Sequence, residues 1–342
     1  MAFLPKIYFP QSIFCGEKGF SFLKTIQNEK KTIVVSDAFQ KLNAEFLQSV
    51  LGENADFFVQ EKEPATEDFN NLKERCLKNG CSYLVAVGGG SVLDLAKLVK
   101  KELGIKMVAI PTTLGSGAEA SQHALLSDNG VKKISSSLGL VPETVILSPA
   151  CLKTLSDGQI VSQSIDALSH GLESLVSRIS NPFSDVLALS SVEIIYGNLE
   201  KLSAGEPKEN LLESFQIAGI LAGIAQSSAA TGLCHSFAHY FGPKNNMGHS
   251  SAVATFLLDV LDLNSGRTDK YKKLDQLKNL SATDFVLKLQ QLFDKLGVKQ
   301  EKIVISGDIK DIAQTIKKDI CTLTNPYSPS IEDIVEIIIK HQ

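Results

Sequence analysis

The sequence predicts two domains: an α/β domain over residues 1–150, followed by an all-α domain over residues 151–342. Two observations support this prediction. The chain has 342 residues, more than the roughly 250–300 that a single hydrophobic core usually serves. Near residue 150 the hydrophobic pattern also changes, from short continuous apolar runs to the spacing of amphipathic helices.

Five short apolar runs predict the strands of the first domain. They are residues 32–35 (TIVV), 55–59 (ADFFV), 83–87 (YLVAV), 106–110 (KMVAI) and 144–147 (TVIL). Helical segments separate these runs. Continuously apolar strands that alternate with helices are typical of a parallel sheet covered on both faces.

Helical spacing of apolar residues predicts the second domain. The pattern is found in Leu189, Val192, Ile195 and Leu199, again over residues 285–296, and again over residues 331–338. Ser330 and Asp333 occupy capping-box positions before the last of these stretches. We expect Asn264–Lys273 to form a polar surface loop.

Composition excludes several classes of protein. The net charge is −4 and only three residues are arginine, which argues against nucleic-acid binding. No apolar run approaches the roughly 18 residues that cross a membrane, and the first 14 residues lack a signal-peptide pattern. Six dispersed cysteines without a CxxC pair favour free thiols in a reducing compartment, so we expect a cytoplasmic protein.

Two glycine-rich segments follow neighbouring predicted strands. Gly88-Gly89-Gly90-Ser91 opens a helix that contains Asp94, and Pro111–Gly117 (PTTLGSG) follows the next strand. Glycines let backbone N–H groups approach a phosphate, and a helix N-terminus adds partial positive charge. A plain strand-to-helix turn is the alternative. Two such loops at adjacent strand ends favour a nucleotide that lies across both.

Asp37 follows the first predicted strand. An acidic residue in this place can bind the ribose hydroxyls of an adenosine and repel a 2′-phosphate. The alternative is an aspartate that serves only the turn.

Four of the six histidines fall between residues 170 and 249. Asp166 and His170, and likewise His235 and His239, are four residues apart and would share a helix face. His249 follows in a glycine-flanked turn. Three imidazoles and a carboxylate suit divalent zinc or iron. The alternative is a set of unrelated polar residues, which is our interpretation of His123 and His341.

Taken in order, five segments resemble the iron-containing (group III) alcohol dehydrogenases, of the dehydroquinate synthase-like superfamily. The segments are GGGSVLDLAK, PTTLGSGAEAS, DALSHGLESLVS, NPFSDVLAL and GLCHSFAHYFG with the following GHSSAV. The resemblance implies a Rossmann-like nucleotide-binding domain and a helical metal-binding domain. It also implies a homodimer, which in this family is often formed by pairing N-terminal strands.

The resemblance places the metal ligands on Asp166, His170, His235 and His249, and a proton donor or relay on His239. It implies cofactor contacts for a larger set of residues. They are Asp37, Gly88, Gly89, Gly90, Ser91, Asp94, Thr112, Thr113, Ser116 and Lys133, with Lys132 as the alternative to Lys133. The acidic Asp37 favours NAD over NADP.

The implied function is metal-dependent hydride transfer between NAD(H) and a small alcohol or aldehyde. The metal is Fe²⁺ or Zn²⁺. Lys244 between the ligands makes an anionic aldehyde, resembling phosphonoacetaldehyde, a further candidate substrate. A dehydroquinate synthase-like lyase or cyclase, a glycerol dehydrogenase-like enzyme and a non-catalytic nucleotide-binding protein are the alternatives. The sequence departs from the family at Glu63, Ser148, Tyr240 and Ser250. Glu63 replaces a cofactor-contacting asparagine of many members. Tyr240 and Ser250 lie near the substrate pocket that the resemblance implies, so the substrate cannot be transferred from a relative.

Overall fold

The computed structural model describes residues 6–52, 56–128, 131–276 and 282–342. The chain folds into two compact units. The sheet unit comprises Tyr8–Leu155 together with Glu209–Gly223. The helical unit is built mainly from Ser156–Lys208 and Ile224–Gln342. The chain therefore returns once to the sheet unit, with Glu209–Gly223.

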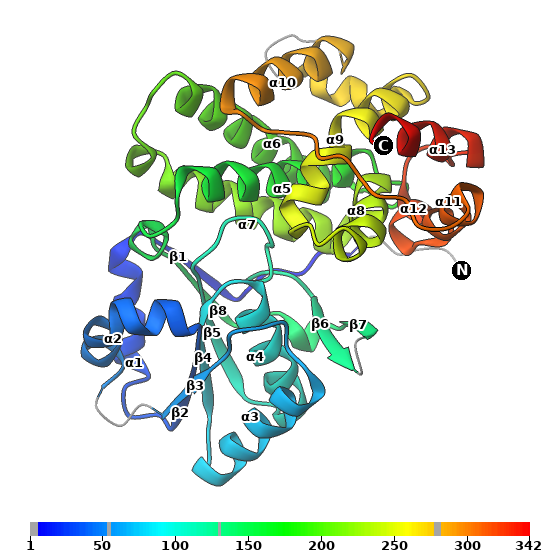
Figure 1. The fold of residues 1–342 in the computed structure, drawn as a ribbon. Coiled ribbons are helices and arrows are strands. Elements are labelled where there is room, and N and C mark those ends of the chain that lie inside the picture. The colour runs from blue at the N-terminus through cyan, green and yellow to red at the C-terminus, as the bar shows by residue number, and fades with distance from the viewer. Residues whose placement is uncertain (1–5, 53–55, 129–130, 277–281) are drawn as a thin grey trace. The chain divides into compact units, whose positions relative to one another are not determined.

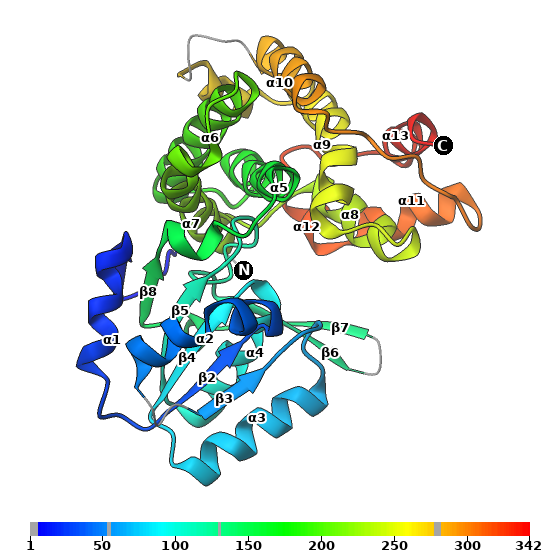
Figure 2. The ribbon, with the colours of Figure 1, turned by 60° about the vertical axis from the view of Figure 1, so that its left-hand side comes forward.

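A six-stranded parallel sheet forms the centre of the sheet unit (Figures 1 and 2). In spatial order its strands are β1 (Ser12–Cys15), β8 (Thr144–Leu147), β5 (Lys106–Pro111), β4 (Tyr83–Gly88), β2 (Lys31–Val35) and β3 (Asp56–Val59). Five of them are the predicted strands, although residue 55, the predicted start of one, lies outside the described residues. Edge strand β1 was not predicted, nor was the antiparallel hairpin of β6 (His123–Asp128) and β7 (Val131–Ser136).

Helices cover both faces of this sheet, as the continuous apolar strands predict. Helices α1 (Ser21–Thr25) and α2 (Asp37–Leu51) lie on one side, and α3 (Thr66–Asn79) and α4 (Gly90–Leu103) lie on the other (Figure 1). Alternate strand residues face the α1 and α2 side, where they join one buried cluster. Its strand members are Ile33, Val35, Val85, Val87, Val108, Ile110 and Ile146.

In the described residues after 155 the structure has nine α-helices and no strand. They are α5 (Asp157–Val176), α6 (Pro182–Ser203), α7 (Leu212–Ala229), α8 (Leu233–Lys244), α9 (His249–Ser265), α10 (Ala282–Leu296), α11 (Ile309–Lys318), α12 (Ile320–Thr324) and α13 (Ile331–Lys340). The predicted capping box before α13 is confirmed: the Asp333 N–H donates to Ser330 Oγ, 3.0 Å away. No single described helix is long and apolar enough to cross a membrane. Helices α7 and α8, which are bent relative to each other by 102°, reach that length and apolar content only when they are taken together.

The prediction of a polar loop over Asn264–Lys273 is wrong. Helix α9 continues through Ser265, and a 3-10 helix occupies Asp269–Gln276. Asn264 is fully buried and exchanges two side-chain hydrogen bonds with Asn325, of 2.9 and 2.8 Å. Tyr271 is also buried. Polar composition misled the prediction because the amide groups are satisfied by a partner 61 residues away in sequence.

Candidate metal centre and cofactor loops

Helix α5 carries the first two predicted ligands on a buried face. Ser156 begins the helix with a capping box, in which its hydroxyl accepts from the Gln159 N–H and the Gln159 side chain accepts from the Ser156 N–H. Asp166 and His170 are both buried one helical turn apart, as predicted. Asp166 Oδ1 lies 4.0 Å from His170 Nε2.

Helices α8 and α9 bring the other two predicted ligands to the same carboxylate. His235, in the first turn of α8, places Nε2 3.8 Å from Asp166 Oδ1. His249 places Nε2 3.6 Å from that oxygen. His249 lies in the first turn of α9, directly after Gly248, and not in a loop. One carboxylate oxygen therefore has three imidazole nitrogens around it.

This arrangement fits a divalent cation. Two ligand atoms that are each about 2.1 Å from one ion lie at most about 4.2 Å apart, and all three distances from Asp166 Oδ1 satisfy this limit. The ligand atoms of Asp166, His170 and His235 also lie within 4.8 Å of one another, a group that does not include His249. Asp166 Oδ1 and His235 Nε2 are both buried and have no hydrogen-bond partner within the described protein. Buried polar atoms are rarely left unpaired. A cation between these atoms would satisfy them both.

The protonation states at the site also suit a metal. Burial, followed by the neighbouring imidazoles of His170 and His249, lowers the pKa of His235 well below its ordinary value. Burial alone would raise the pKa of Asp166, but the surrounding histidines outweigh it and lower that pKa. The site therefore presents a neutral imidazole and a carboxylate, which are the forms that ligate metals.

Glu173, which sequence reasoning missed, is a partner of a predicted ligand. Its Oε2 lies 2.5 Å from Nδ1 of His235, and its Oε1 accepts from the Cys234 N–H at 2.7 Å. The carboxylate thus caps the start of α8 and also directs Nε2 of His235 toward Asp166. Burial raises the pKa of Glu173 to about 7, although hydrogen bonds from the backbone N–H groups of Gly232 and Cys234 act to lower it. The sequence feature that could have identified Glu173 is its position seven residues after Asp166, which places both residues on the same face of α5.

We expect Glu173→Gln to weaken metal binding by about 10- to 100-fold, the usual effect of losing a partner that orients a ligating histidine. Glutamine supplies one acceptor oxygen where glutamate supplies two, so either His235 or the Cys234 N–H loses its partner. Titration with a competing chelator measures the change. Glu193→Gln, on the exposed side of α6, is the matched control. Equal affinity in both variants and the unchanged protein would contradict the assigned role.

His239 lies next to the four predicted ligands and has a different partner. Its ring centroid is 6.2 Å from that of His235 and 6.1 Å from that of His249. Its Nδ1 lies 3.4 Å from Oδ2 of Asp319, the residue that precedes α12. Asp319 also accepts from the Ser236 hydroxyl and the Cys321 N–H. Burial raises the pKa of Asp319, but these hydrogen bonds outweigh burial and lower it to about 2.

His239, Asp319 and Cys321 form a second group whose ligand atoms lie close enough to share an ion. Cys321 makes this group the poorer metal site. Burial, followed by the nearby charge of Asp319, raises the pKa of its thiol well above the ordinary value, and thiols bind metals as thiolates. The thiol also accepts a hydrogen bond from Thr231.

The two predicted cofactor loops meet at the carboxyl ends of adjacent strands. Strands β4 and β5 pair in parallel register with Gly88 opposite Pro111, and the Thr112 N–H donates to Gly88 O. A Cβ atom on Gly89 would lie 3.1 Å from the Thr113 side chain, and one on Gly90 would lie 3.4 Å from Ser116. These glycines therefore allow close contact between the loops.

The start of α4 between these loops suits an anion. Gly89 precedes the helix and offers no side-chain cap, so the first N–H groups keep their capacity to bind a ligand. The predicted Ser91, Thr112, Thr113 and Ser116 are all half-buried, which leaves part of each residue accessible. A pyrophosphate fits this combination of glycines, hydroxyls and helix N-terminus.

Asp94 is occupied within the protein. Its Oδ2 accepts from the Leu125 N–H at 3.0 Å, and its Oδ1 lies 3.3 Å from the buried Nζ of Lys97. Lys97 also donates to Ser121 Oγ and to the His123 carbonyl. These contacts attach α4 to β6 and fix Asp94 one turn after the glycine loop, and its contact with the cofactor stays a prediction.

Two further predicted cofactor residues lie near the surface of the sheet unit. Asp37 is the first residue of α2, and its Oδ2 lies 2.5 Å from Nζ of Lys41. Lys133, on β7, is exposed and pairs with Asp128 at 2.6 Å. The two histidines that were interpreted as structural lie outside the metal cluster: His123 pairs with Ser136 Oγ, and the buried His341 pairs with Asp259.

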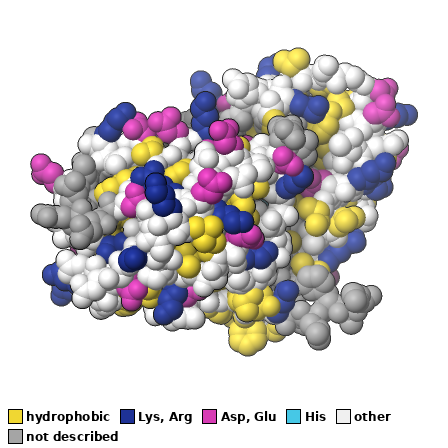
Figure 3. All heavy atoms as spheres, turned by 90° about the horizontal axis from the view of Figure 1, so that it is seen from below, with side chains coloured by type: hydrophobic (Ala, Val, Ile, Leu, Met, Phe, Trp, Pro, Cys, Tyr) yellow, Lys and Arg dark blue, Asp and Glu magenta, His cyan; other side chains and the backbone are white. Residues whose placement is uncertain are grey.

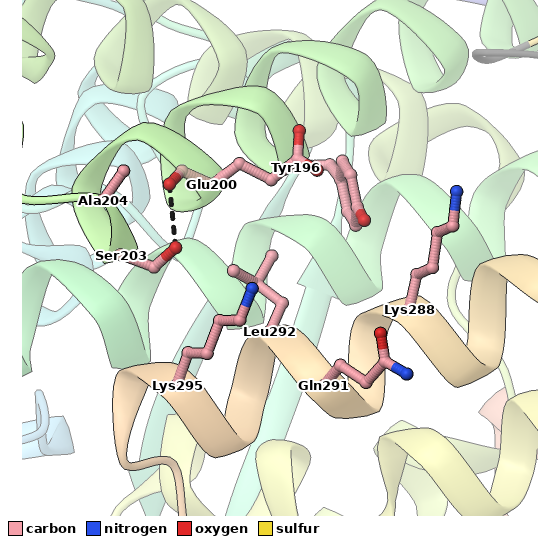
Figure 4. A pocket seen from close by; sticks show the side chains of 8 residues that line it. All are labelled: Tyr196, Glu200, Ser203, Ala204, Lys288, Gln291, Leu292 and Lys295. Atoms are coloured by element: carbon pink, nitrogen blue, oxygen red, sulfur yellow. Dashed lines mark hydrogen bonds between the residues drawn. The ribbon is translucent and has the colours of Figure 1, made fainter.

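A separate pocket of about 440 Å³ lies between α6 and α10 (Figure 4). Its lining residues are Tyr196, Glu200, Ser203, Ala204, Lys288, Gln291, Leu292 and Lys295. None of them belongs to the predicted site. On the molecular face seen in Figure 3, basic and acidic side chains are interspersed, with no broad field of one sign. This distribution agrees with the small net charge of −4.

Comparison with known proteins gives family matches in both parts of the chain. The model of iron-containing alcohol dehydrogenase matches residues 10–149, and the C-terminal model of the Fe-containing alcohol dehydrogenase family matches residues 160–341. The probable alcohol dehydrogenase EutG of Escherichia coli strain K12 is 29% identical over 82% of this chain and 78% of its own length. The NAD-dependent methanol dehydrogenase of Bacillus methanolicus is 26% identical over 90% of this chain and 91% of its own length.

The fold is shared with solved structures. The iron-containing alcohol dehydrogenase of Thermococcus thioreducens has a TM-score of 0.88 and 23% identity, with 99% of both chains covered. Fold and site thus define an oxidoreductase of alcohols and aldehydes. The chain belongs to the iron-containing alcohol dehydrogenase family. The matches support this interpretation over the lyase and the non-catalytic nucleotide-binding protein that the sequence left open.

Proposed function

We propose that Asp166, His170, His235 and His249 bind Fe²⁺ or Zn²⁺ in an enzyme that transfers a hydride between NAD(H) and a small alcohol or aldehyde. One observation carries the proposal: Asp166 Oδ1 has three imidazole nitrogens within 4.0 Å but accepts no hydrogen bond in the described protein. We further propose that the domain boundary near residue 150 separates nucleotide-binding from metal-binding functions.

When bound, the metal supplies a Lewis acid that polarises the carbon–oxygen bond, and the nicotinamide supplies the hydride acceptor or donor. The residues of the chain set the charge of this site. With neutral imidazoles, the four ligands contribute a single negative charge, from Asp166. A divalent ion held by these four residues would therefore keep a net positive charge, which its role as a Lewis acid requires.

His239 serves as the proton relay in this proposal. Oxidation of an alcohol releases one hydride and one proton, and the proton needs an acceptor. Asp319 lies beside Nδ1 of His239 and favours a proton on that nitrogen, so Nε2 stays available to accept the hydroxyl proton. His239 is 40% exposed in its side chain, which leaves it a route to water.

We propose NAD as the cofactor because Asp37 places a carboxylate at the start of α2, directly after strand β2. The relative from Bacillus methanolicus is likewise NAD-dependent by name. Gly88–Ser91, Thr112, Thr113 and Ser116 are the proposed pyrophosphate contacts. Lys133 is the proposed ribose contact, and reaching the cofactor requires it to leave Asp128.

We expect Asp37→Asn to shift the cofactor preference toward NADPH: the kcat/KM for NADPH, divided by that for NADH, should rise by about 10-fold or more. The substitution removes the repulsion between the carboxylate and the 2′-phosphate, and about 1.4 kcal/mol corresponds to a factor of 10. Loss of the carboxylate also frees Lys41 to meet a 2′-phosphate. Initial rates with each nucleotide at several concentrations measure the ratio. Glu45→Gln, exposed on the same helix, is the control. A preference for NADPH in the unchanged protein would contradict this role of Asp37.

The activity itself is tested by the absorbance of NADH at 340 nm with a panel of small aldehydes. We expect net oxidation of NADH that is lost after removal of metal by a chelator and restored by Fe²⁺ or Zn²⁺. Turnover without a net change of NADH would instead indicate the lyase alternative.

An anionic aldehyde stays a prediction for the substrate. Lys244 is exposed near the end of α8, and its Nζ lies 4.8 Å from the centroid of the Tyr240 ring. Comparing kcat/KM for aldehydes with and without an acidic group, in the unchanged protein and in Lys244→Ala, tests this prediction. If Lys244 binds the acidic group, Lys244→Ala lowers kcat/KM for the acidic aldehydes and leaves kcat/KM for the other aldehydes unchanged.

We also propose a cytoplasmic homodimer. All six cysteines are free, which suits a reducing compartment. Within the described residues β1 pairs only with β8, so it presents an outer edge, and Phe9 and Ile13 near that edge are exposed. Unprotected strand edges favour pairing with another chain. Light scattering coupled to gel filtration measures the mass in solution.

A further inference from the structure

Helix α3 ends in a turn that brings two cysteines together. Gly80 has a positive φ of 62°, its N–H donates to Leu77 O at 3.1 Å, and the Cys81 N–H donates to Cys76 O at 2.9 Å. These two crossed hydrogen bonds define a Schellman motif. The motif places the side chain three positions before the C-cap against the side chain two positions after it. In this helix those two residues are Cys76 and Cys81.

The surroundings of the pair keep the two sulfurs in contact. Cys76 is buried and Cys81 is half-buried, and their side chains are hydrogen-bonded to each other. Thr32, near the start of β2, lies beside both cysteines and lowers the pKa of each, and its hydroxyl donates to Asp56 Oδ2 at 3.3 Å. The thiol of Cys81 also donates to the carbonyl of Tyr83, the first residue of β4, at 2.8 Å. The pair therefore lies at the amino ends of the parallel strands, whereas Gly88 lies at the carboxyl end of β4.

We propose that Cys76 and Cys81 are a reversible oxidation site: a hydroperoxide oxidises Cys81, and Cys76 then closes an intrachain disulfide. Two features select Cys81 as the first thiol to react. It is the more accessible of the two. The hydrogen bond from Cys76 is the largest influence on its pKa and lowers it to about 6, although burial acts in the opposite direction. A thiolate is the reactive form of cysteine.

The chemistry balances in two steps. The Cys81 thiolate attacks one oxygen of the peroxide, a sulfur–oxygen bond forms, the oxygen–oxygen bond breaks, and the leaving hydroxide is protonated to water. Cys76 sulfur then attacks Cys81 sulfur, the disulfide forms, and the sulfenic oxygen leaves as a second water with the Cys76 proton. Two electrons pass from the two thiols to one peroxide. A dithiol reductant reverses the disulfide.

The other four cysteines do not share these features. Cys15 is exposed, but burial of its sulfur, followed by the charge of Glu213, raises the pKa of its thiol. Cys151, Cys234 and Cys321 are buried, and burial raises the pKa of each. Selective oxidation should therefore be confined to the pair.

The test treats the reduced full-length protein with one equivalent of hydrogen peroxide at neutral pH, alkylates the remaining thiols, and maps tryptic peptides by mass spectrometry. Trypsin cuts after Lys78, so the expected disulfide links two peptides that otherwise separate. We expect this linked species in the unchanged protein and in the control Cys15→Ser, and its loss after reduction with dithiothreitol.

Two variants separate the roles of the thiols. In Cys76→Ser we expect Cys81 to accumulate as a sulfenic acid that dimedone traps, while in Cys81→Ser we expect Cys76 to stay reduced. In the unchanged protein, alkylation of Cys81 should set in at a lower pH than that of an ordinary thiol, because the hydrogen bond from Cys76 lowers the pKa of Cys81. Treated protein in which Cys76 and Cys81 are both still fully alkylated, or in which the linked peptides join two chains, would overturn the proposal.

Discussion

Asp166→Asn should lose its metal and lower kcat/KM by about 10³-fold, as expected when roughly 4 kcal/mol of Lewis-acid stabilisation is removed. The substitution keeps the size of the side chain and removes the charge that faces His170, His235 and His249. An uncharged amide oxygen is a weaker ligand than a carboxylate. Metal content per chain and initial rates with NADH and an aldehyde measure the two effects together.

Asp157→Asn is the matched control in the same helix. Asp157 is 73% exposed in its side chain and pairs with Lys208 at 3.1 Å, and surface pairs of this kind contribute little. We expect normal metal content and turnover in this variant. If Asp166→Asn kept a full equivalent of metal and its turnover, the assignment of the site would be wrong.

His239→Ala should keep the metal but reduce turnover by about 10²- to 10⁴-fold, the usual contribution of general acid–base catalysis. His239 and His235 are four residues apart on α8, yet only His235 lies in the first turn, where Glu173 directs it toward Asp166. We therefore expect opposite results from two similar substitutions. His235→Ala should lose the metal, whereas His239→Ala should retain it.

Metal analysis of both variants, followed by kinetics of the metal-loaded His239→Ala protein, decides this prediction. Loss of metal in His239→Ala would make that residue a ligand. Unchanged kinetics with intact metal would remove its role in proton transfer. Asp319→Asn should lower turnover by a smaller factor, because Asp319 acts only by holding Nδ1 of His239.

The strands predicted from the sequence are those with continuous apolar runs. Such a run reflects a sheet covered on both faces, and it can be recognised without knowing which strands pair with each other. The sequence did not predict β1, whose burial alternates and whose partner β8 lies 132 residues further along the chain (Ser12 opposite Thr144). The hairpin of β6 and β7 was missed for a related reason. Its strands carry charged and hydroxyl side chains, and they are fixed by pairing and by contact with α4.

The site likewise combines residues that a local sequence pattern predicts with residues that only contacts distant in sequence bring together. Asp166, His170, His235 and His239 stand at helical spacing, so their convergence on two helix faces could be expected. Glu173 and Asp319 act through histidines that lie 62 and 80 residues away in sequence. Glu173 at least shares a face of α5 with Asp166, whereas no local pattern marks Asp319. Asp94 shows a further limit: the sequence predicts a cofactor contact there, but it does not reveal that the carboxylate pairs with Lys97 and accepts from the Leu125 N–H.

X-ray absorption spectroscopy of the zinc- or iron-loaded protein is the most direct test of the metal centre. We predict a shell of nitrogen and oxygen ligands at about 2.0–2.2 Å, with scattering typical of three imidazoles and no sulfur. A sulfur ligand at about 2.3 Å would instead place the metal with His239, Asp319 and Cys321, or next to Cys234, and would contradict the assignment to Asp166, His170, His235 and His249.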